Sequence, residues 1–310
     1  MKDKRVVFMG TPDFAVPVLE ELIKSTNVVL VVTQPDKPVG RSGEVKFTPI
    51  KKVAVKNGIE VFQPIKIRND YEVILNANPD IIITCAYGQI IPKVLLDLPK
   101  YGAVNVHASL LPKLRGGAPL HKAIMMGEEE TGITIMYMDE KMDNGDIISQ
   151  EKTPILDSDN VGKIHDRLSV MGAKLLIKTL PSIFEGTNER IKQNEEEVTY
   201  AYNVTREEEK IDFNKTAKEV FNHIRGLYPY PVGYSVLNGN VIKILESKLS
   251  LSTKGNPGEI TDINNDGIVV RCADKSVVIT RVKPSGKKEM TAKDFVNGQG
   301  KDKLLKEVFE

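Results

Sequence analysis

The stretch from residue 5 to residue 33 constrains the fold most, because it specifies a strand, a tight turn, a helix and a second strand in succession. Arg5–Met9 is a short apolar run, and Gly10 opens a turn into a segment with apolar residues at helical spacing. Val28–Thr33 is another apolar run, rich in β-branched residues. Two strands joined by a crossover of this length pair in parallel, which indicates a doubly wound α/β sheet.

A third apolar run, Asp80–Ala86, has the length and β-branching of a central strand of this sheet. The segment Tyr87–Pro92 follows it and would lie at the carboxyl end of the strand, where open α/β sheets bind their ligands. The three-glycine dinucleotide fingerprint is missing after the first strand, which disfavours a nicotinamide or flavin cofactor.

Length and composition indicate an ordinary soluble protein with two domains. The chain has 310 residues, 41% of them hydrophobic, and lacks the run of about 18 apolar residues that would span a membrane. It passes directly from residue 1 into a strand pattern, so we expect no signal peptide and a cytoplasmic location. The default expectation for the oligomeric state is a monomer.

Cysteine, histidine and charge are equally uninformative about special chemistry. Cys85 and Cys272 lie far apart in apolar runs, which suits buried thiols rather than a disulfide. The four histidines have no metal-ligand spacing, so we expect no metal. A net charge of +1 means that any nucleic-acid binding must rely on local basic patches.

The stretch from Ala103 to Ile148 gathers the polar groups that an acyl transfer needs. Asn105 and His107 stand two residues apart in a β-prone segment and so would point to the same side. An amide donor beside an imidazole could stabilise an oxyanion. A further strand, Gly132–Met138, delivers Asp139 and then Asp143 in an Asp-Asn-Gly turn, where a carboxylate could orient the histidine. Taken alone, these residues also fit a capping or core role and ordinary turn chemistry.

The exact amino-acid sequence of these segments favours the catalytic interpretation, because it resembles a known family. Asn-Val-His-Ala-Ser-Leu-Leu-Pro, Arg-Gly-Gly-Ala-Pro, Thr-Gly-Ile-Thr-Ile and Met-Asp-Asn-Gly-Asp occur in this order. The chain thereby resembles the folate-dependent formyltransferases, and within them the methionyl-tRNA branch. The resemblance covers nearly the whole chain and implies formyl transfer from 10-formyltetrahydrofolate to the α-amino group of methionyl initiator tRNA. The chain departs from it at Leu114, where family members often have Trp.

The resemblance also implies roles for individual residues. Asn105, His107 and Asp143 would be catalytic: the first two would meet the oxyanion, while Asp143 would hold His107 and favour its charged form. Folate would be contacted by the segment Met138–Asp143 and by residues of two further segments, Gln89, Ile91, Ser109, Leu110, Leu111 and Pro112.

A long loop from Gln34 to Pro49 is rich in proline, glycine and positive charge. By itself it reads either as a phosphate-binding patch or as a solvated, lysine-rich surface. In the family the corresponding loop enters the tRNA acceptor stem. The resemblance therefore implies that Arg41 contacts RNA, together with Lys37 and Lys46.

The last third of the chain changes pattern. After a polar stretch around residues 189–206 and one helix come five short β-like runs separated by Asn-, Gly- and Asp-rich turns, which predict a small antiparallel barrel. The resemblance makes it OB-like and tRNA-binding, with Lys287 and Lys288 as phosphate-facing candidates. We therefore expect a Rossmann-like catalytic domain at 1–188, a linker at 189–206 and an OB-like domain at 207–310.

Two other functions remain open at this point. One is a formyltransferase whose acceptor is a small nucleotide or amino-sugar nucleotide. The other is a noncatalytic RNA-binding protein that keeps the α/β domain as a scaffold. The basic loop and the barrel argue against the first, and the presence of Asn105, His107 and Asp143 argues against the second.

Overall fold

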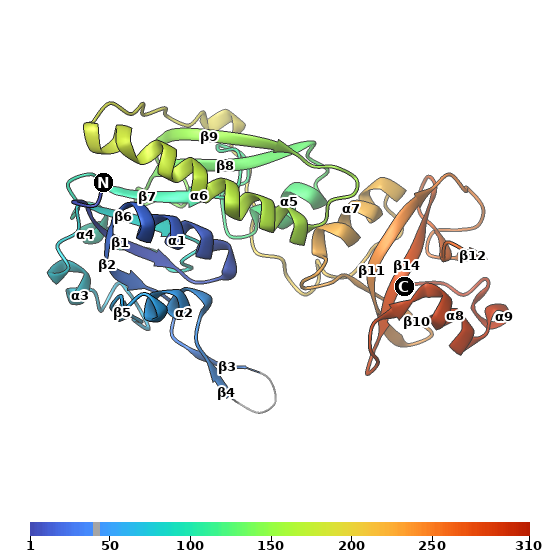
Figure 1. Cartoon of the computed structure of the whole chain (residues 1–310). Coiled ribbons are helices and arrows are strands. Elements are labelled where there is room, and N and C mark those ends of the chain that lie inside the picture. The colour runs from blue at the N-terminus through green and yellow to red at the C-terminus, as the bar shows by residue number, and fades with distance from the viewer. Residues whose placement is uncertain (40–43) are drawn as a thin grey trace. The chain divides into compact units, whose positions relative to one another are not determined.

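The computed structural model describes residues 1–39 and 44–310 and divides the chain into two compact units (Figure 1). The first unit comprises residues 1–119, 131–153 and 165–202, and the second comprises 120–130, 154–164 and 203–310. The two short segments 120–130 and 154–164 thus belong to the second unit, although the chain on either side of each belongs to the first. Within the described residues, no helix has both the length and the apolar character needed to cross a membrane.

The first unit is built on a seven-stranded sheet with strand order β5-β2-β1-β6-β7-β8-β9. The strands β5, β2, β1, β6 and β7 run parallel, whereas β8 pairs with β7 in the antiparallel sense. The predicted doubly wound sheet is confirmed. The strand bounds are β1 Arg5–Gly10, β2 Asn27–Val32, β5 Val61–Phe62, β6 Ile81–Cys85, β7 Ala103–His107, β8 Glu130–Tyr137 and β9 Ile147–Pro154.

Helices cover both faces of this sheet. On one face, Val7 and Met9 of β1 share a buried core with Ile74 and Leu95, which lie on α3 and α4. On the other, Gly172 of α6 lies so close to β7 that a Cβ there would stand 2.9 Å from Val106. The helix bounds are α1 Val16–Ser25, α2 Pro49–Lys56, α3 Glu72–Asn76, α4 Lys93–Leu96, α5 Pro119–Met125 and α6 Val161–Glu185, and a short 3-10 helix, η1 Asp13–Ala15, precedes α1.

Two features of this unit do not follow from the sequence pattern. The segment read as a long loop contains a hairpin, in which β3 (Lys37–Val39) pairs with β4 (Glu44–Lys46). Strand β9 was not predicted, because its middle residues Gln150, Glu151 and Lys152 are polar and at least partly exposed at the edge of the sheet.

The cysteines behave as expected: Cys85 and Cys272 are buried free thiols, and burial raises the pKa of each, that of Cys272 to about 12.

The second unit contains the predicted antiparallel sheet, with strand order β10-β11-β14-β13-β12 and the short β15 beside β14. Helix α7 begins at a capping box formed by Thr216 and Glu219, which satisfies backbone donors at its amino terminus. The bounds are α7 Ala217–Leu227, β10 Tyr234–Leu237, β11 Asn240–Ser250, β12 Ile260–Ile263, β13 Ile268–Arg271, β14 Ser276–Pro284, β15 Met290–Thr291, α8 Ala292–Gln299 and α9 Lys301–Leu304.

The last five residues close this sheet into a barrel. Their backbone bonds to both edge strands: Phe309 bridges Leu237 on β10, and the Lys306 N–H donates to the carbonyl of Ile260 on β12 at 2.9 Å. The Phe309 ring is 3% exposed and belongs to the core of the barrel. The closing segment is therefore held by backbone pairing on both sides and by one buried aromatic ring.

We predict that Phe309→Ala lowers the free energy of unfolding of the second unit by about 3–5 kcal/mol, because it removes a buried ring and leaves a cavity. Urea denaturation followed by far-UV circular dichroism measures this. Val308→Ala is the matched control, since Val308 lies in the same closing segment with its side chain 47% exposed and should change the value by less than about 0.5 kcal/mol. Equal effects of the two substitutions would contradict the role assigned to the ring.

Candidate functional site

Asn105 and His107 lie at the carboxyl end of β7, next to β6 and β8. Asn105 pairs with Met136 and His107 with Thr134 across the antiparallel ladder, so both side chains stand on the same face of the strand. His107 is 6% exposed. The expected alignment of the two side chains is thus met by the register.

The imidazole of His107 has a fixed neighbour at each nitrogen. Nε2 bonds the carbonyl oxygen of Leu114 at 3.1 Å, and since a carbonyl only accepts, Nε2 carries the proton. Nδ1 lies 3.6 Å from Oδ1 of Asp143, within ion-pair range but beyond a closed hydrogen bond. Nδ1 is therefore the nitrogen that remains able to take a further partner.

Asp143 is held from the other side by the backbone. The N–H of Gly116 donates to Oδ2 of Asp143 at 2.8 Å, which leaves Oδ1 facing His107. Asp143 itself has a φ of +52°, an unusual conformation for a residue other than glycine. Gly145 makes the turn possible, because a Cβ at that position would stand 1.9 Å from the carbonyl oxygen of Tyr137.

Asp139, another acidic residue of this segment, forms its hydrogen bonds within the turn itself. Its Oδ1 accepts from the N–H of Lys141 at 2.9 Å and its Oδ2 accepts from Nδ2 of Asn144 at 2.7 Å. Of the carboxylates between β8 and β9, all of which lie in the described part of the chain, Asp143 is the one that faces His107.

Two residues that the sequence pattern did not reveal as part of the site hold this turn in place. Gln193 donates from Nε2 to the carbonyls of Asp143 and Gly145, at 2.8 and 2.9 Å. Arg115, 3% exposed, donates to Gln193 at 3.0 Å, to Asn144 at 3.1 Å and to Glu195 at 2.9 Å. Bonds to three acceptors compensate the burial of the guanidinium charge.

The amide of Asn105 is oriented by a neighbouring strand. Oγ1 of Thr84, the penultimate residue of β6, donates to Oδ1 of Asn105 at 2.8 Å. The same Thr84 hydroxyl also lies 3.2 Å from Sδ of Met138 and 3.5 Å from the carbonyl oxygen of Val104. Because the amide oxygen is engaged, the NH₂ group of Asn105 is the end that can donate to a ligand.

The segment Ser109–Pro112 is fastened through Thr134. The Thr134 hydroxyl donates to the carbonyl of Ser109 at 2.7 Å and accepts from the N–H of Leu111 at 3.1 Å. Gln150 on β9 donates to the carbonyl of Leu111 at 2.8 Å. Ser109 and Leu111 are buried, whereas Leu110 and Pro112 are partly exposed and can reach a ligand.

The segment after β6 is likewise anchored by hydrogen bonds, but its exposed isoleucine is not the one expected to contact folate. Oε1 of Gln89 accepts from the N–H of Ile67 at 2.8 Å, and its Nε2 donates to Gln34 at 3.2 Å. Ile91, one of the expected folate contacts, is 5% exposed and packs in the core, whereas Ile90 is 86% exposed. Among residues 1–39 and 44–310, the buried hydroxyl of Tyr87 has no hydrogen-bond partner, and burial raises the pKa of this tyrosine.

The basic candidates fall into two groups. Lys37 and Lys46 are exposed and lie directly opposite each other in the β3–β4 hairpin, while Arg41 lies outside the described residues. Lys51 at the base of the hairpin forms an ion pair with Asp36, and hydrogen bonds from Lys51 and Gln63 lower the pKa of that carboxyl although its burial opposes them. Lys287 and Lys288 are exposed in the turn that connects β14 to β15.

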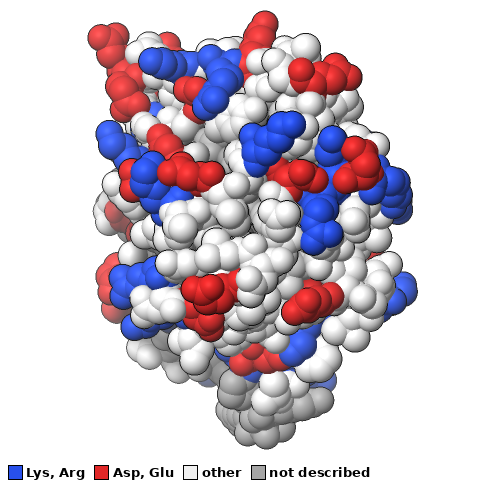
Figure 2. Space-filling model, turned by 90° about the vertical axis from the view of Figure 1, so that its left-hand side faces the viewer, with Lys and Arg blue, Asp and Glu red and all other residues white. Residues whose placement is uncertain are grey.

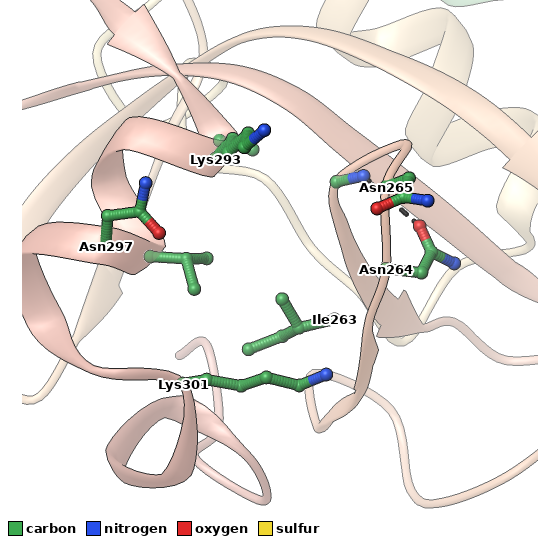
Figure 3. A pocket seen from close by; sticks show the side chains of 9 residues that line it. Ile263, Asn264, Asn265, Lys293, Asn297 and Lys301 are labelled. Atoms are coloured by element: carbon green, nitrogen blue, oxygen red, sulfur yellow. Dashed lines mark hydrogen bonds between the residues drawn. The ribbon is translucent and has the colours of Figure 1, made fainter.

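The barrel also carries a pocket of about 340 Å³ between the β12–β13 turn and helix α8 (Figure 3). Lys293 and Lys301 lie on opposite sides of it, and Asn264, Asn265 and Asn297 line it (Figure 3). Elsewhere the surface is mixed: on the face drawn in Figure 2, Lys and Arg are interspersed with Asp and Glu. Over residues 1–39 and 44–310, no group of three or more acidic, His or Cys residues could hold a metal ion.

Comparison with known proteins identifies the family. A family model described as formyl transferase matches residues 4–180, and its C-terminal domain model matches residues 203–300. Curated methionyl-tRNA formyltransferases from Geobacillus sp. (strain WCH70) and Bacillus cereus (strain B4264) are 53% and 54% identical to the chain over 301 and 299 residues. These alignments cover 96% and 95% of this chain and 95% of each relative. The chain belongs to the methionyl-tRNA formyltransferase family.

Two solved structures share the fold at lower sequence identity. The sugar 3N-formyl transferase WlaRD, in the presence of dTDP and 5-N-formyl-THF, matches with a TM-score of 0.68 at 21% identity, covering 93% of this chain and 100% of that one. The N-formyltransferase from Helicobacter canadensis, in complex with folinic acid and dTDP-3-aminofucose, matches with a TM-score of 0.68 at 24% identity, over 90% and 99%.

We predict that Gln193→Ala lowers turnover by at least about tenfold, because it frees the Asp143 turn and misplaces the carboxylate beside His107. The same substitution should lower the free energy of unfolding by only about 1–3 kcal/mol, the contribution of its hydrogen bonds. Steady-state formyl transfer and urea denaturation measure the two effects. Lys192→Ala, which alters the exposed neighbouring residue, should change neither. Unaltered turnover in Gln193→Ala would refute the positioning role.

Proposed function

We propose that this chain transfers the formyl group of 10-formyltetrahydrofolate to the α-amino group of methionine carried by initiator tRNA, and that it does so as a cytoplasmic monomer. The single observation that carries the chemistry is the cluster of Asn105, His107 and Asp143 at the carboxyl end of the sheet, with Nδ1 of His107 3.6 Å from Asp143. The names of the relatives at 53–54% identity support the acceptor.

The proposed reaction needs no covalent enzyme intermediate. The neutral amine attacks the formyl carbon, the C=O electrons move to oxygen, and the C–N bond to the folate then breaks as that oxyanion collapses. The NH₂ group of Asn105 donates to the oxyanion, because its carbonyl oxygen already accepts from Thr84. His107, in its doubly protonated form, donates to the same oxyanion through Nδ1, since the N–H of Nε2 already donates to the carbonyl of Leu114. Asp143 holds the imidazole and helps an ordered water move the proton from the amine to the leaving nitrogen.

The donor is assigned to the segments that flank this cluster. Gln89, Ile91 and the stretch Ser109, Leu110, Leu111 and Pro112 form its proposed walls, together with Met138–Asp143. The fit is supported by partly exposed apolar groups at Leu110 and Pro112 beside anchored backbone. In this arrangement the buried Ile91 supports the wall from the core, and the exposed Ile90 supplies additional apolar surface for the donor.

The proposed tRNA contacts rest on charge and geometry. Lys37 and Lys46 are directly opposed across the β3–β4 hairpin, and their like charges repel each other in the free protein. A phosphate bound between them would remove this repulsion. Arg41 belongs to the same loop in sequence. On the barrel, Lys287 and Lys288 supply a second contact.

We assign catalysis to residues 1–188, a linker to 189–206 and tRNA binding to 207–310.

The deciding experiment is formyl transfer from 10-formyltetrahydrofolate to charged methionyl initiator tRNA, run beside free methionine and amino-sugar nucleotides. Transfer to the tRNA alone is the expected result. Transfer only to a small amine would keep the chemistry and overturn the acceptor, and no transfer to any of them would overturn the enzymatic function. Sedimentation of the free protein tests the monomer.

We predict that Asn105→Ala lowers kcat by roughly 10²–10³-fold, because it removes one oxyanion donor, and leaves the KM for methionyl-tRNA nearly unchanged. Steady-state kinetics with the tRNA as the varied substrate measures both constants. Asn76→Ala is the matched control, since Asn76 is the exposed last residue of α3, before the start of β6. A raised KM with unchanged kcat would overturn the assignment of Asn105.

A further inference from the structure

A pair of tyrosines lies beside the candidate site and takes no part in the chemistry described so far. The rings of Tyr200 and Tyr202 are stacked, with centroids 5.5 Å apart and planes inclined by 2°. Both are exposed, Tyr200 by 48% and Tyr202 by 63%. Two parallel aromatic faces open to solvent are a costly arrangement for a surface that meets only water.

Backbone pairing connects this pair directly to the residues that hold the site. Tyr200 forms a parallel bridge with Arg115. The N–H of Arg115 donates to the carbonyl of Thr199 at 2.9 Å, and the N–H of Ala201 donates back to Arg115 at 2.7 Å. The residues on either side of Arg115 are Leu114, which binds His107, and Gly116, which binds Asp143. One backbone bridge therefore separates the tyrosine pair from the candidate catalytic residues.

We propose that Tyr200 and Tyr202 form a stacking platform for an unpaired base at the 3′ end of the acceptor tRNA. This inference rests on the proposed function, in which the methionyl ester at the 3′-terminal ribose must reach Asn105 and His107. The bases next to that ester are single-stranded, and single-stranded bases bind proteins by stacking on aromatic rings.

Local charge favours a base over a phosphate as the partner. The acidic turn Glu195–Glu197 lies just before the tyrosines and is exposed, which repels the sugar-phosphate backbone. The ring face of a base carries no net charge and can stack there. The platform would thus hold the 3′ end by its base and fix the distance from that base to the formyl carbon, independently of which base it is.

The test uses Tyr200→Leu and Tyr202→Leu in the full chain, with Tyr200→Phe and Tyr202→Phe as variants that keep the ring. Each Leu variant should lower kcat/KM for methionyl-tRNA by on the order of tenfold, and each Phe variant should stay within about twofold of the parent, because stacking needs the ring and not the hydroxyl. Val170→Ala removes an exposed apolar side chain from α6 and serves as the control.

A second substrate separates stacking from a merely structural role. Methionyl-tRNA with an abasic nucleotide at a 3′ unpaired position should lose rate with the parent protein and lose nothing further with the Leu variants. Additive losses, or Phe variants as weak as the Leu variants, would overturn the platform. If the parent protein formylates methionyl-tRNA but the Leu variants match it, only this inference fails; if the parent does not formylate it, the proposed function fails first.

Discussion

The carboxylate of Asp143 is the interaction on which the arrangement of the site depends. One oxygen accepts the N–H of Gly116 and the other faces Nδ1 of His107. The same short segment supplies the carbonyl of Leu114 to the opposite nitrogen of the ring. Strand β7, the turn after β8 and residues 114–116 therefore fix one another, so none of them reaches its final geometry alone. The left-handed φ of Asp143 persists because its neighbours determine it.

This constraint explains why a polar stretch far along the chain returns to the site. Gln193 closes two carbonyls of the turn, and Arg115 is buried only because Gln193, Asn144 and Glu195 accept its donors. A buried guanidinium without such partners would cost several kcal/mol. The segment that composition marks as a linker thus includes residues that complete the framework of the site.

The sequence predicts those elements whose signal is local. Apolar runs such as Asp80–Ala86 predict buried strands of a parallel sheet, and the Asn- and Gly-rich turns mark where the strands of the barrel end. Resemblance points to Asn105, His107 and Asp143, and the structure brings the last two together. By contrast, Arg115 and Gln193 are 78 positions apart and share no pattern. The closure of the barrel by residues 306–310 is equally hidden, because five residues are too short to show a period.

The charge balance of the chain bears on how an RNA substrate would be distinguished. Nonspecific affinity for nucleic acid comes from phosphate contacts and grows with the number of cations that a surface presents. Here the net charge is +1 and, on the face in Figure 2, basic and acidic side chains are interspersed. Local patches such as the opposed Lys37 and Lys46 then provide attraction at only a few points. Under the proposed function, the protein selects its tRNA substrate where the aminoacylated 3′ end meets Asn105 and His107, and not through overall charge. Only a correctly bound ester brings its amine to the formyl carbon.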